Sequence, residues 1–476
     1  MKTKILLIII SITMLVSAQI TFEKWYGGME EEEGQAVQQT TDGGYIFAAS
    51  SRSYGAGNYD IYLIRTNEYG DTIWTRTYGG TGYDIAADVL QTNDGGFIIA
   101  GYTSSVGSGD IYLIRTNSSG DTLWTKTIGG PYNDHVKDMR KTSDGGFILG
   151  GDIDEGGTSK YYLVKINSLG DTLWTKSYYY GQVYSVQQTS GGGYILAVYP
   201  YTDPSGIIDM KLVKTDNFGN ISWIKTYGGS NYDMSFAVQQ TTDGGYIVAG
   251  RTDSFGAGAS DFILLKTNSD GDSLWAKTYG GTADERAFAV HQTQDGGYIL
   301  AGYTHSFGEG STDFYLVRTD SNGDTIWTRT HGGNHEEMLN DLELTADGGF
   351  VAIGHTYSFG QVANPDAYVV KTNSEGMVTD VFESTLNRPK VFLLSQNFPN
   401  PFNPTTTIRW QMPEGGFVTL KIFDVLGREV TMLVNGELST GKHETIFDAM
   451  SYSSGVYFYQ FKAGDFIETK EMILLK

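Results

Sequence analysis

The chain has 476 residues, enough for one large domain and a small one. Its formal net charge of −22 argues against a nucleic-acid partner, which would need a basic surface. It contains no cysteine, so disulfides, thiolate metal sites and a lipid-modified cysteine anchor are excluded.

The first 18 residues have the pattern of a secretory signal peptide. Lys2 and Lys4 supply the positive start, 5–16 form the apolar stretch, and Val16-Ser17-Ala18 is a small-residue cleavage site. The apolar stretch is too short to span a bilayer comfortably, and no later segment approaches that length. We therefore expect export to the periplasm and no transmembrane segment in the mature chain.

A repeat of about 50 residues fills most of the chain after this segment. Its D-G-G-[YF] core stands at 42–45, 94–97, 144–147, 243–246, 295–298 and 347–350, with G-G-G-Y at 191–194. Each copy holds short alternating or apolar runs joined by Gly and Asp turns, as in the copy 236–281, which is typical of four strands. Such a repeat predicts a β-propeller with one blade per copy. The layout resembles that of kelch propellers, which implies a shared architecture only.

Counting strands predicts how the ring closes. Seven copies carry the first three strands, but only six carry the Trp-bearing fourth strand, and the last copy runs into 374–384 without a Trp. The missing strand matches 20–28 at the other end, with Phe22 in the Trp position. We expect an all-β fold in which 19–376 form a seven-bladed propeller and the N-terminal strand completes the last blade, which removes a free sheet edge.

Acidic residues recur at the start of the first strand of each repeat except the fourth. They are Glu32, Asp84, Asp134, Asp233, Glu285 and Glu337. One interpretation is a ring of carboxylates at the mouth of the central channel that binds cations or sugar hydroxyls, or that supplies an acid and base pair for glycoside cleavage. The other is structural, since a residue present in every repeat usually stabilises the repeat, here by accepting backbone N–H groups.

Aromatic residues offer a second set of candidate binding residues. Tyr54, Phe255, Phe307 and Phe359 follow the second strand of their repeats, where they either stack on sugar rings or fill gaps between blades. The fourth repeat departs most from the pattern: it lacks the Gly-Gly acid loop and adds Tyr199 and Tyr201. A private binding site in that repeat and simple drift of a redundant copy are both open.

No motif indicates catalysis or a resident metal. The turns 268–272 and 320–324 resemble fragments of calcium loops but lack the full ligand set, so Ca²⁺ stays an alternative to a plain hairpin turn. Five histidines lie in the last two repeats without a standard metal-ligand spacing. We expect no cofactor and no catalytic residue in the usual patterns.

The repeat ends near 376, and 377–394 reads as a linker. The motifs that follow are Asn397-Phe398-Pro399-Asn400-Pro401-Phe402-Asn403-Pro404, then Leu426-Gly427-Arg428-Glu429-Val430, then Ser454-Gly455-Val456-Tyr457, and a terminal Lys476. Residues 395–476 closely resemble the C-terminal sorting domain of type IX secretion cargo. The resemblance implies interaction with that secretion machinery, passage across the outer membrane and removal of the domain on export. The alternating strands predict a small β-sandwich.

These features together predict a secreted or outer-surface protein. We expect a non-catalytic binding module with a glycan or a surface protein as ligand. Two alternatives stay open: a glycan-acting, endoglucanase-like hydrolase that uses carboxylates such as Asp84, Asp233 and Glu337, and a structural or adhesive surface component. A propeller fold by itself does not choose among them, because the same fold carries many functions.

Overall fold

The computed structural model describes residues 19–107, 109–201, 207–360, 364–379, 392–413, 415–438, 441–464 and 466–475. The chain divides into two compact units, Met1–Thr379 and Asp380–Lys476. The described residues form strands, turns and loops and no helix. Within these described ranges, no helix has the length and hydrophobicity needed to cross a membrane. The expected signal peptide and most of the expected linker lie outside them.

The first unit contains strands β1 to β27. The first half comprises β1 (Phe22–Tyr26), β2 (Glu32–Gln39), β3 (Tyr45–Ser51), β4 (Asp60–Thr66), β5 (Thr72–Tyr78), β6 (Asp84–Gln91), β7 (Phe97–Thr103), β8 (Asp110–Thr116), β9 (Thr122–Ile128), β10 (Asp134–Lys141), β11 (Phe147–Asp154), β12 (Ser159–Ile166) and β13 (Thr172–Gln188). The second half comprises β14 (Tyr194–Pro200), β15 (Met210–Thr215), β16 (Ile221–Tyr227), β17 (Asp233–Gln240), β18 (Tyr246–Thr252), β19 (Asp261–Thr267), β20 (Ser273–Tyr279), β21 (Glu285–Gln292), β22 (Tyr298–Thr304), β23 (Asp313–Thr319), β24 (Thr325–His331), β25 (Glu337–Leu344), β26 (Phe350–Thr356) and β27 (Asp366–Thr372).

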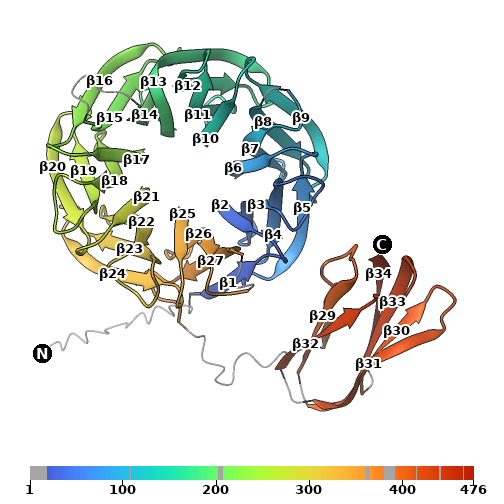
Figure 1. Ribbon diagram of the computed structural model, residues 1–476. Helices are drawn as coiled ribbons and strands as arrows, with labels where there is room; N and C mark the ends of the chain where they lie inside the picture. The colour runs from blue at the N-terminus through green and yellow to red at the C-terminus, as the bar shows by residue number, and fades with distance from the viewer. Residues whose placement is uncertain are drawn as a thin grey trace, which may run out of the picture. The chain divides into compact units, whose positions relative to one another are not determined.

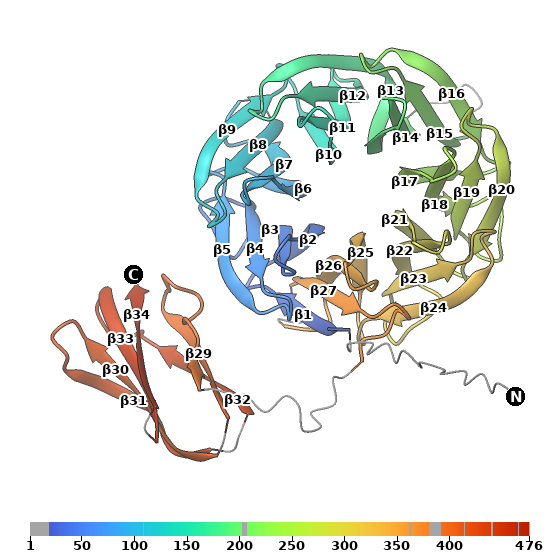
Figure 2. The ribbon, with the colours of Figure 1, turned by 180° about the vertical axis from the view of Figure 1, so that it is seen from behind.

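These strands form antiparallel sheets arranged radially in a ring, with the first strand of each repeat innermost (Figure 1). Figure 2 shows the same ring from behind. Four-stranded sheets repeated around a central channel are the arrangement of a β-propeller. We number the repeats by their innermost strands: β2, β6, β10, the second half of β13, β17, β21 and β25 define repeats 1 to 7.

Repeats 3 and 4 share one continuous strand. The first half of β13 pairs with β12, and its second half pairs with β14, so that β10 to β16 form one sheet of seven strands. The other repeats place a Gly-Gly turn between their outer strand and the next inner strand, as at Gly79-Gly80. The corresponding segment, Tyr178–Tyr180, has no such pair of glycines, and the chain stays extended there.

Turn chemistry explains why each repeat folds back on itself. In the turn between the first two strands of repeat 1, the Gly43 N–H donates to the Thr40 carbonyl at 2.9 Å, and the Asp42 carboxylate accepts the Thr40 hydroxyl at 2.6 Å. Gly43 adopts φ = 89°, a conformation that residues with a Cβ rarely adopt. The turn between the last two strands uses Asn67, whose Oδ1 accepts the N–H groups of Tyr69 and Asp71.

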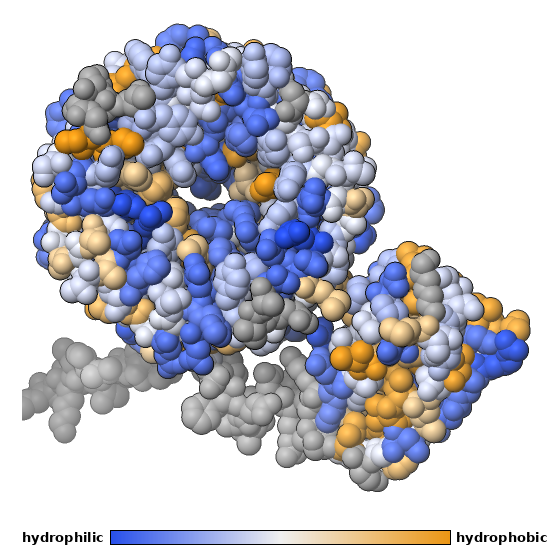
Figure 3. All heavy atoms as spheres, in the orientation of Figure 1, coloured by the Kyte–Doolittle hydropathy of each residue, from blue (hydrophilic) through white to orange (hydrophobic). Residues whose placement is uncertain are grey.

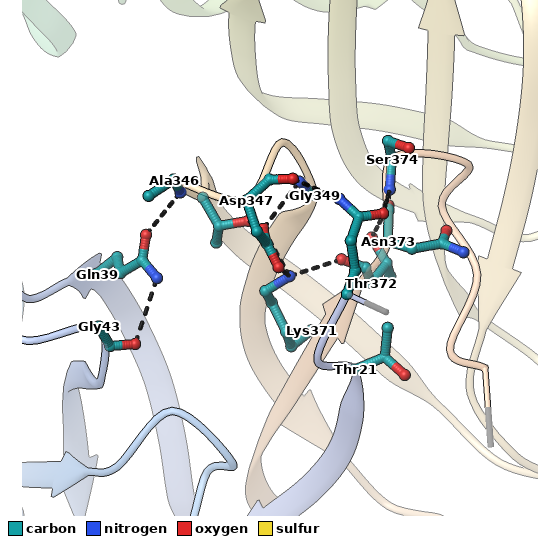
Figure 4. Close-up of polar contacts among 12 residues, drawn as sticks. Thr21, Gln39, Gly43, Ala346, Asp347, Gly349, Lys371, Thr372, Asn373 and Ser374 are labelled. Carbon is teal, nitrogen blue, oxygen red and sulfur yellow. Dashed lines mark hydrogen bonds and ion pairs between the residues drawn. The ribbon is translucent and has the colours of Figure 1, made fainter. Parts of the chain in front are cut away.

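The N-terminal strand belongs to the sheet of repeat 7. β1 pairs antiparallel with β27, with Phe22 opposite Lys371 and Tyr26 opposite Ala367, in the order β1-β27-β26-β25. On the inner side, repeats 7 and 1 also touch directly. Gln39 Oε1 accepts the Ala346 N–H at 2.8 Å (Figure 4). One carboxylate oxygen of Asp341 accepts the Val37 N–H at 3.0 Å.

The outer strands contact the next repeat by a repeated set of side chains. In repeat 1, the Tyr78 hydroxyl donates to the Gly120 carbonyl at 2.6 Å, and a Cβ on Gly120 would lie 2.9 Å from the Trp74 ring. β1 makes the same contacts with repeat 1: the Phe22 ring lies against Gly70, and Tyr26 donates to the Gly70 carbonyl at 2.7 Å.

The hydrophobic cores lie between neighbouring sheets. One core joins Ile46 and Leu63 of repeat 1 to Val89 and Phe97 of repeat 2, and each of these side chains is at least 95% buried. Another joins Phe22 of β1 and Val369 of β27 to residues of repeat 1. Each sheet is therefore apolar on both faces, which is why the second and third strands read as continuous apolar runs.

The second unit contains strands β28 to β34. They are β28 (Leu393–Leu394), β29 (Thr405–Met412), β30 (Gly416–Asp424), β31 (Glu429–Leu438), β32 (Gly441–Asp448), β33 (Gly455–Ala463) and β34 (Phe466–Leu474). They form a three-stranded sheet, β28-β29-β32, and a four-stranded sheet, β31-β30-β33-β34. Side chains of both sheets, such as Trp410 and Phe461, share one core. This is a two-sheet arrangement, as the alternating strands of the sequence predict.

Candidate binding site

The six carboxylates expected at the channel mouth are buried. Each is the first residue of its innermost strand, and each side chain belongs to a residue with 0% exposure. In all six repeats one carboxylate oxygen accepts the N–H of the glycine four residues earlier, at 2.5–2.9 Å. In repeat 7, the other oxygen of Glu337 accepts the Thr356 hydroxyl at 2.7 Å.

These contacts assign a structural role to the acidic ring. Each carboxylate satisfies the N–H groups of the loop that leads into its strand, and a buried N–H without a partner would cost about 1–3 kcal/mol. Burial of Asp134 raises the pKa of its carboxyl group. The expectation of an exposed acidic funnel is therefore corrected: Glu32, Asp84, Asp134, Asp233, Glu285 and Glu337 hold loops in place and present no surface to a ligand.

The four loop aromatics divide into two kinds. Phe255 and Phe307 are 51% and 43% exposed, whereas Tyr54 and Phe359 are partly buried. The Tyr54 hydroxyl donates to the Gly27 carbonyl at 2.8 Å, and Phe359 stacks on Trp25 with ring centroids 5.3 Å apart. Tyr54 thus fills a gap where repeats 7 and 1 meet, and Phe359 fills one where repeats 6 and 7 meet. Ligand binding by Phe255 and Phe307 stays a prediction.

The two calcium-like turns have the geometry of the other hairpin turns. Asp320 Oδ1 accepts the N–H groups of Asn322 and Asp324 at 2.8 and 2.9 Å. Asn268 does the same in repeat 5, and one oxygen of Asp272 pairs with Lys225 at 2.8 Å. Among the residues that the structure describes, no cluster of three or more His, Asp or Glu side chains has metal-site geometry. Calcium binding stays the alternative to a plain hairpin turn.

The channel wall differs from repeat to repeat, a feature that the repeat pattern alone does not indicate. Each innermost strand carries a β-bulge, where one extra residue re-aims a side chain. In Figure 3 the ring is open at its centre, with residues of very different hydropathy around the opening. The bulge residues in chain order are Gln35, Ala87, Lys137, Tyr184, Phe236, Phe288 and Asn340.

Repeats 4, 5 and 6 make one part of this wall aromatic. The rings of Tyr184 and Phe236 lie 5.0 Å apart, those of Phe236 and Phe288 lie 5.1 Å apart, and Tyr303 lies 5.8 Å beyond Phe288. Tyr199, which the sequence marked as unusual, contacts Tyr184 edge-to-face at 6.2 Å. None of these side chains belongs to a core between two sheets.

Repeats 7, 2 and 3 contribute a cluster of charges. Arg140 Nε lies 2.9 Å from a carboxylate oxygen of Asp138, and Asp88, Asp341 and Glu343 lie within its electrostatic reach. Burial, and then the neighbouring Asp341, raise the pKa of Glu343 to about 7. Asp88, Asp138 and Asp341 each accept a backbone N–H from the next repeat at 2.7–3.0 Å.

A signal for this asymmetry is present in the sequence. The two residues around the bulge vary in charge and size between repeats, whereas the turns and apolar strands hardly vary. A repeat that conserves its core but varies one inward position indicates a surface that is free to specialise. The position of the β-bulge must be known to identify this inward residue, because simple alternation along the strand does not tell which side chain faces the channel.

Two family models match parts of this chain. One, described as a secretion system C-terminal sorting domain, matches residues 396–475. The other, described as a β-propeller domain of unknown function, matches residues 293–325. The regulatory protein FlaEY of Caulobacter vibrioides is 29% identical over 128 residues, which is 24% of this chain and 13% of the length of that protein.

Solved structures with similar folds come from several sources. PorZ, a surface component of the type IX secretion system of Porphyromonas gingivalis, has a TM-score of 0.43 and 11% identity, covering 90% of this chain and 58% of its own. The β-propeller domain of the trilobed protease from Pyrococcus furiosus has a TM-score of 0.44 and 9% identity, covering 76% of this chain and 100% of its own. The WD40 domain of Neurospora crassa Pan2 has a TM-score of 0.44 and 10% identity, and the match covers 76% of this chain and 98% of the Pan2 domain.

The motifs quoted from the sequence, the two-sheet unit and the family match agree for the C-terminal part of the chain. The resemblance to type IX secretion cargo is therefore confirmed for that part. Residues 396–475 are a C-terminal sorting domain of the type IX secretion system, carried by a chain whose larger unit is a β-propeller.

Proposed function

We propose that this protein is exported in two steps and acts outside the cell. Residues 1–18 direct it to the periplasm as a signal peptide, 19–376 form the functional propeller, 377–394 are a linker, and 395–476 direct passage through the type IX machinery. The family match to the sorting domain supports the second step. The lysines and apolar stretch at the start of the sequence support the first.

We propose a seven-bladed ring that β1 completes. Seven sequence repeats and the pairing of Phe22 with Lys371 support this count. The hydrogen bonds from Ala346 to Gln39 and from Val37 to Asp341 support closure on the inner side. A ring joined at both its inner and outer strands keeps the channel wall in a fixed arrangement, as a binding surface requires.

We propose that the propeller is a non-catalytic binding module for a glycan or a surface protein. The observation that carries this proposal is the asymmetric channel wall, aromatic in repeats 4 to 6 and charged in repeats 7, 2 and 3. Aromatic rings with a few placed polar groups are typical of binding sites. The alternative of glycan hydrolysis has no support in the geometry of Asp84, Asp233 and Glu337, which are 0% exposed.

A binding screen tests this role. The protein purified after export from its host is applied to a glycan array and, in parallel, to outer-membrane extract of the same cells for co-purification. We expect selective, saturable capture of at least one glycan or surface protein. Absence of any capture, with intact folding by circular dichroism, would leave the structural role. Release of reducing sugar from a captured glycan would contradict the non-catalytic assignment.

A further inference from the structure

We propose that the aromatic wall of repeats 4 to 6, together with Arg286, is a binding site for a carboxylated sugar, such as a uronic acid residue of a glycan. The inference rests on the proposed binding role and names the ligand class. The site comprises Tyr184 on β13, Phe236 on β17, and Arg286 and Phe288 on β21, with Tyr303 on β22.

Arg286 lacks a partner for its charge. Its guanidinium lies over the Tyr303 ring at 5.9 Å, and its Nε is buried without a hydrogen-bond acceptor. Within the described ranges no carboxylate lies at ion-pair distance from it. The other cation that acts on Tyr303 is neutralised: Arg251 pairs with Asp253 at 2.8 Å.

An unpaired guanidinium in a partly buried wall favours an anionic ligand. Its planar fork of N–H donors matches the two oxygens of a carboxylate. An unsatisfied buried N–H is costly, so a ligand that supplies an acceptor to this group recovers that cost. Arg286 also acts electrostatically on both Tyr184 and Tyr303, which places it within the aromatic row.

The aromatic row supplies the second half of a sugar site. Four rings lie in sequence, with centroid separations of 5.0, 5.1 and 5.8 Å, and they come from three different repeats. Phe236 is 7% exposed, while Tyr184 and Phe288 are more accessible. Flat, partly exposed rings beside polar groups favour ligands that offer an apolar face and a polar edge.

A uronic acid combines both properties in one residue. Its ring presents a C–H face for stacking, and its carboxylate reaches a guanidinium at the edge of that face. An acidic peptide side chain carries the anion without the flat face. A long polyanion is disfavoured, because the net charge of −22 repels it and one unpaired arginine offers little compensation. The ligand we expect is thus a short acidic segment or a chain end.

The test is calorimetric titration of the exported protein with trigalacturonate at about 0.15 M salt, where long-range repulsion is screened. Maltotriose serves as the neutral sugar and triglutamate as the acidic peptide. We expect binding of trigalacturonate alone. Arg286→Gln should weaken it about tenfold or more, because a hydrogen bond to a charged group is lost. Phe288→Leu, which keeps apolar volume but removes the ring, should weaken it about fivefold.

Arg329→Gln is the matched control. Arg329 lies over the Trp327 ring at 5.3 Å in the same repeat, but on the outer strand β24. The Arg329→Gln substitution should change the affinity for trigalacturonate by less than about twofold. Arg286→Lys keeps the positive charge but loses the planar set of N–H donors of the guanidinium, so it should bind trigalacturonate with intermediate affinity. This variant also tests the site if Arg286→Gln fails to fold.

Three results overturn this site. They are no binding of trigalacturonate at millimolar concentration, equal affinity of the wild type and the folded Arg286 variants, and equal binding of triglutamate. If the screen captures a neutral glycan or a surface protein while trigalacturonate does not bind, the carboxylated-sugar site is wrong and the binding role stands. If nothing is captured in either experiment, both proposals fall.

Discussion

At the scale of single residues, the D-G-G core of the repeat joins a turn to a buried cation. The aspartate of the turn pairs with an arginine or lysine on the third strand in six repeats, at 2.5–3.0 Å. In repeat 2 the Thr92 hydroxyl, together with Arg115, lowers the pKa of the Asp94 carboxyl group to about 2. Repeat 4 has Gly191 in place of the aspartate. There Lys214 Nζ donates to the Thr215 carbonyl, and burial lowers its pKa.

Gly191→Asp should therefore stabilise the protein. A Cβ at this position meets nothing within 4 Å, and the new carboxylate would face Lys214 as in the other repeats. We expect a gain of about 1 kcal/mol in the free energy of unfolding, in part from the reduced entropy of the unfolded chain. Gly191→Ala separates that entropy from the ion pair. Denaturant titration at pH 7 measures both, and equal stability of the two variants would contradict the expected pair.

The gain from the ion pair should depend on pH in a defined direction. A paired aspartate has a lowered pKa in the folded state, so its contribution is present above the unfolded pKa and is lost as the pH falls through the folded pKa. The advantage of Gly191→Asp over Gly191→Ala should thus be complete at pH 7, begin to fall near pH 4 and disappear as the pH approaches about 2. This repeats the behaviour expected for Asp94, whose pKa is about 2.

At the scale of elements, β1 carries out the function of an outer strand although it comes from the opposite end of the repeat region. Its Phe22 and Tyr26 contact Gly70 as Trp74 and Tyr78 contact Gly120. Lys24 pairs with Asp71 at 2.6 Å, as Lys126 pairs with Asp171 at 2.6 Å. The strand is thus held by the turn of repeat 1 as well as by β27.

Phe22→Ala and Trp25→Ala test this strand from its two faces. Phe22 is 8% exposed and packs on Tyr45, whereas Trp25 is 48% exposed. We expect Phe22→Ala to lower the free energy of unfolding by about 3–5 kcal/mol, since a buried aromatic is removed. Trp25→Ala should cost about 1 kcal/mol. Thermal unfolding and proteolysis near residue 20 measure this, and equal losses would argue against an anchored β1.

At the scale of the whole molecule, the ring brings together charges that lie far apart in the sequence. Asp88, Arg140, Asp341 and Glu343 come from repeats 2, 3 and 7. A single arginine faces several carboxylates there, and the largest effect on Glu343 is its own burial. The channel therefore holds at least one carboxyl group whose pKa, about 7, lies far above its ordinary value of 4.5.

Glu343→Gln should stabilise the protein at high pH. A carboxyl group with a raised folded pKa binds its proton more tightly in the folded state, so its stabilising effect is present below pH 4.5 and is lost as the pH rises through about 7. We expect the free energy of unfolding of the glutamine variant to exceed that of the wild type by about 1–3 kcal/mol at pH 8, and by much less at pH 5. Urea titrations at the two values measure it.

Glu375→Gln is the control for this comparison. Glu375 is exposed in the turn that follows β27 of repeat 7, away from the innermost strand. It should leave stability unchanged within about 0.5 kcal/mol at both pH values. A gain for Glu343→Gln that is the same at pH 5 and pH 8 would mean that packing, and not ionisation, causes it.

The sequence by itself determined the repeat, the strands and the sorting domain. Turn residues and apolar alternation act over a few positions, so Asp42, Gly43 and the run 45–51 indicate their local structure without the rest of the chain. The sorting motifs are likewise local. The tertiary structure decided which polar side chains are exposed. Glu32 and Glu337 are buried because the loops around the start of their strands close over them. Tyr184, Phe236 and Arg286 meet only because separate repeats converge on one channel.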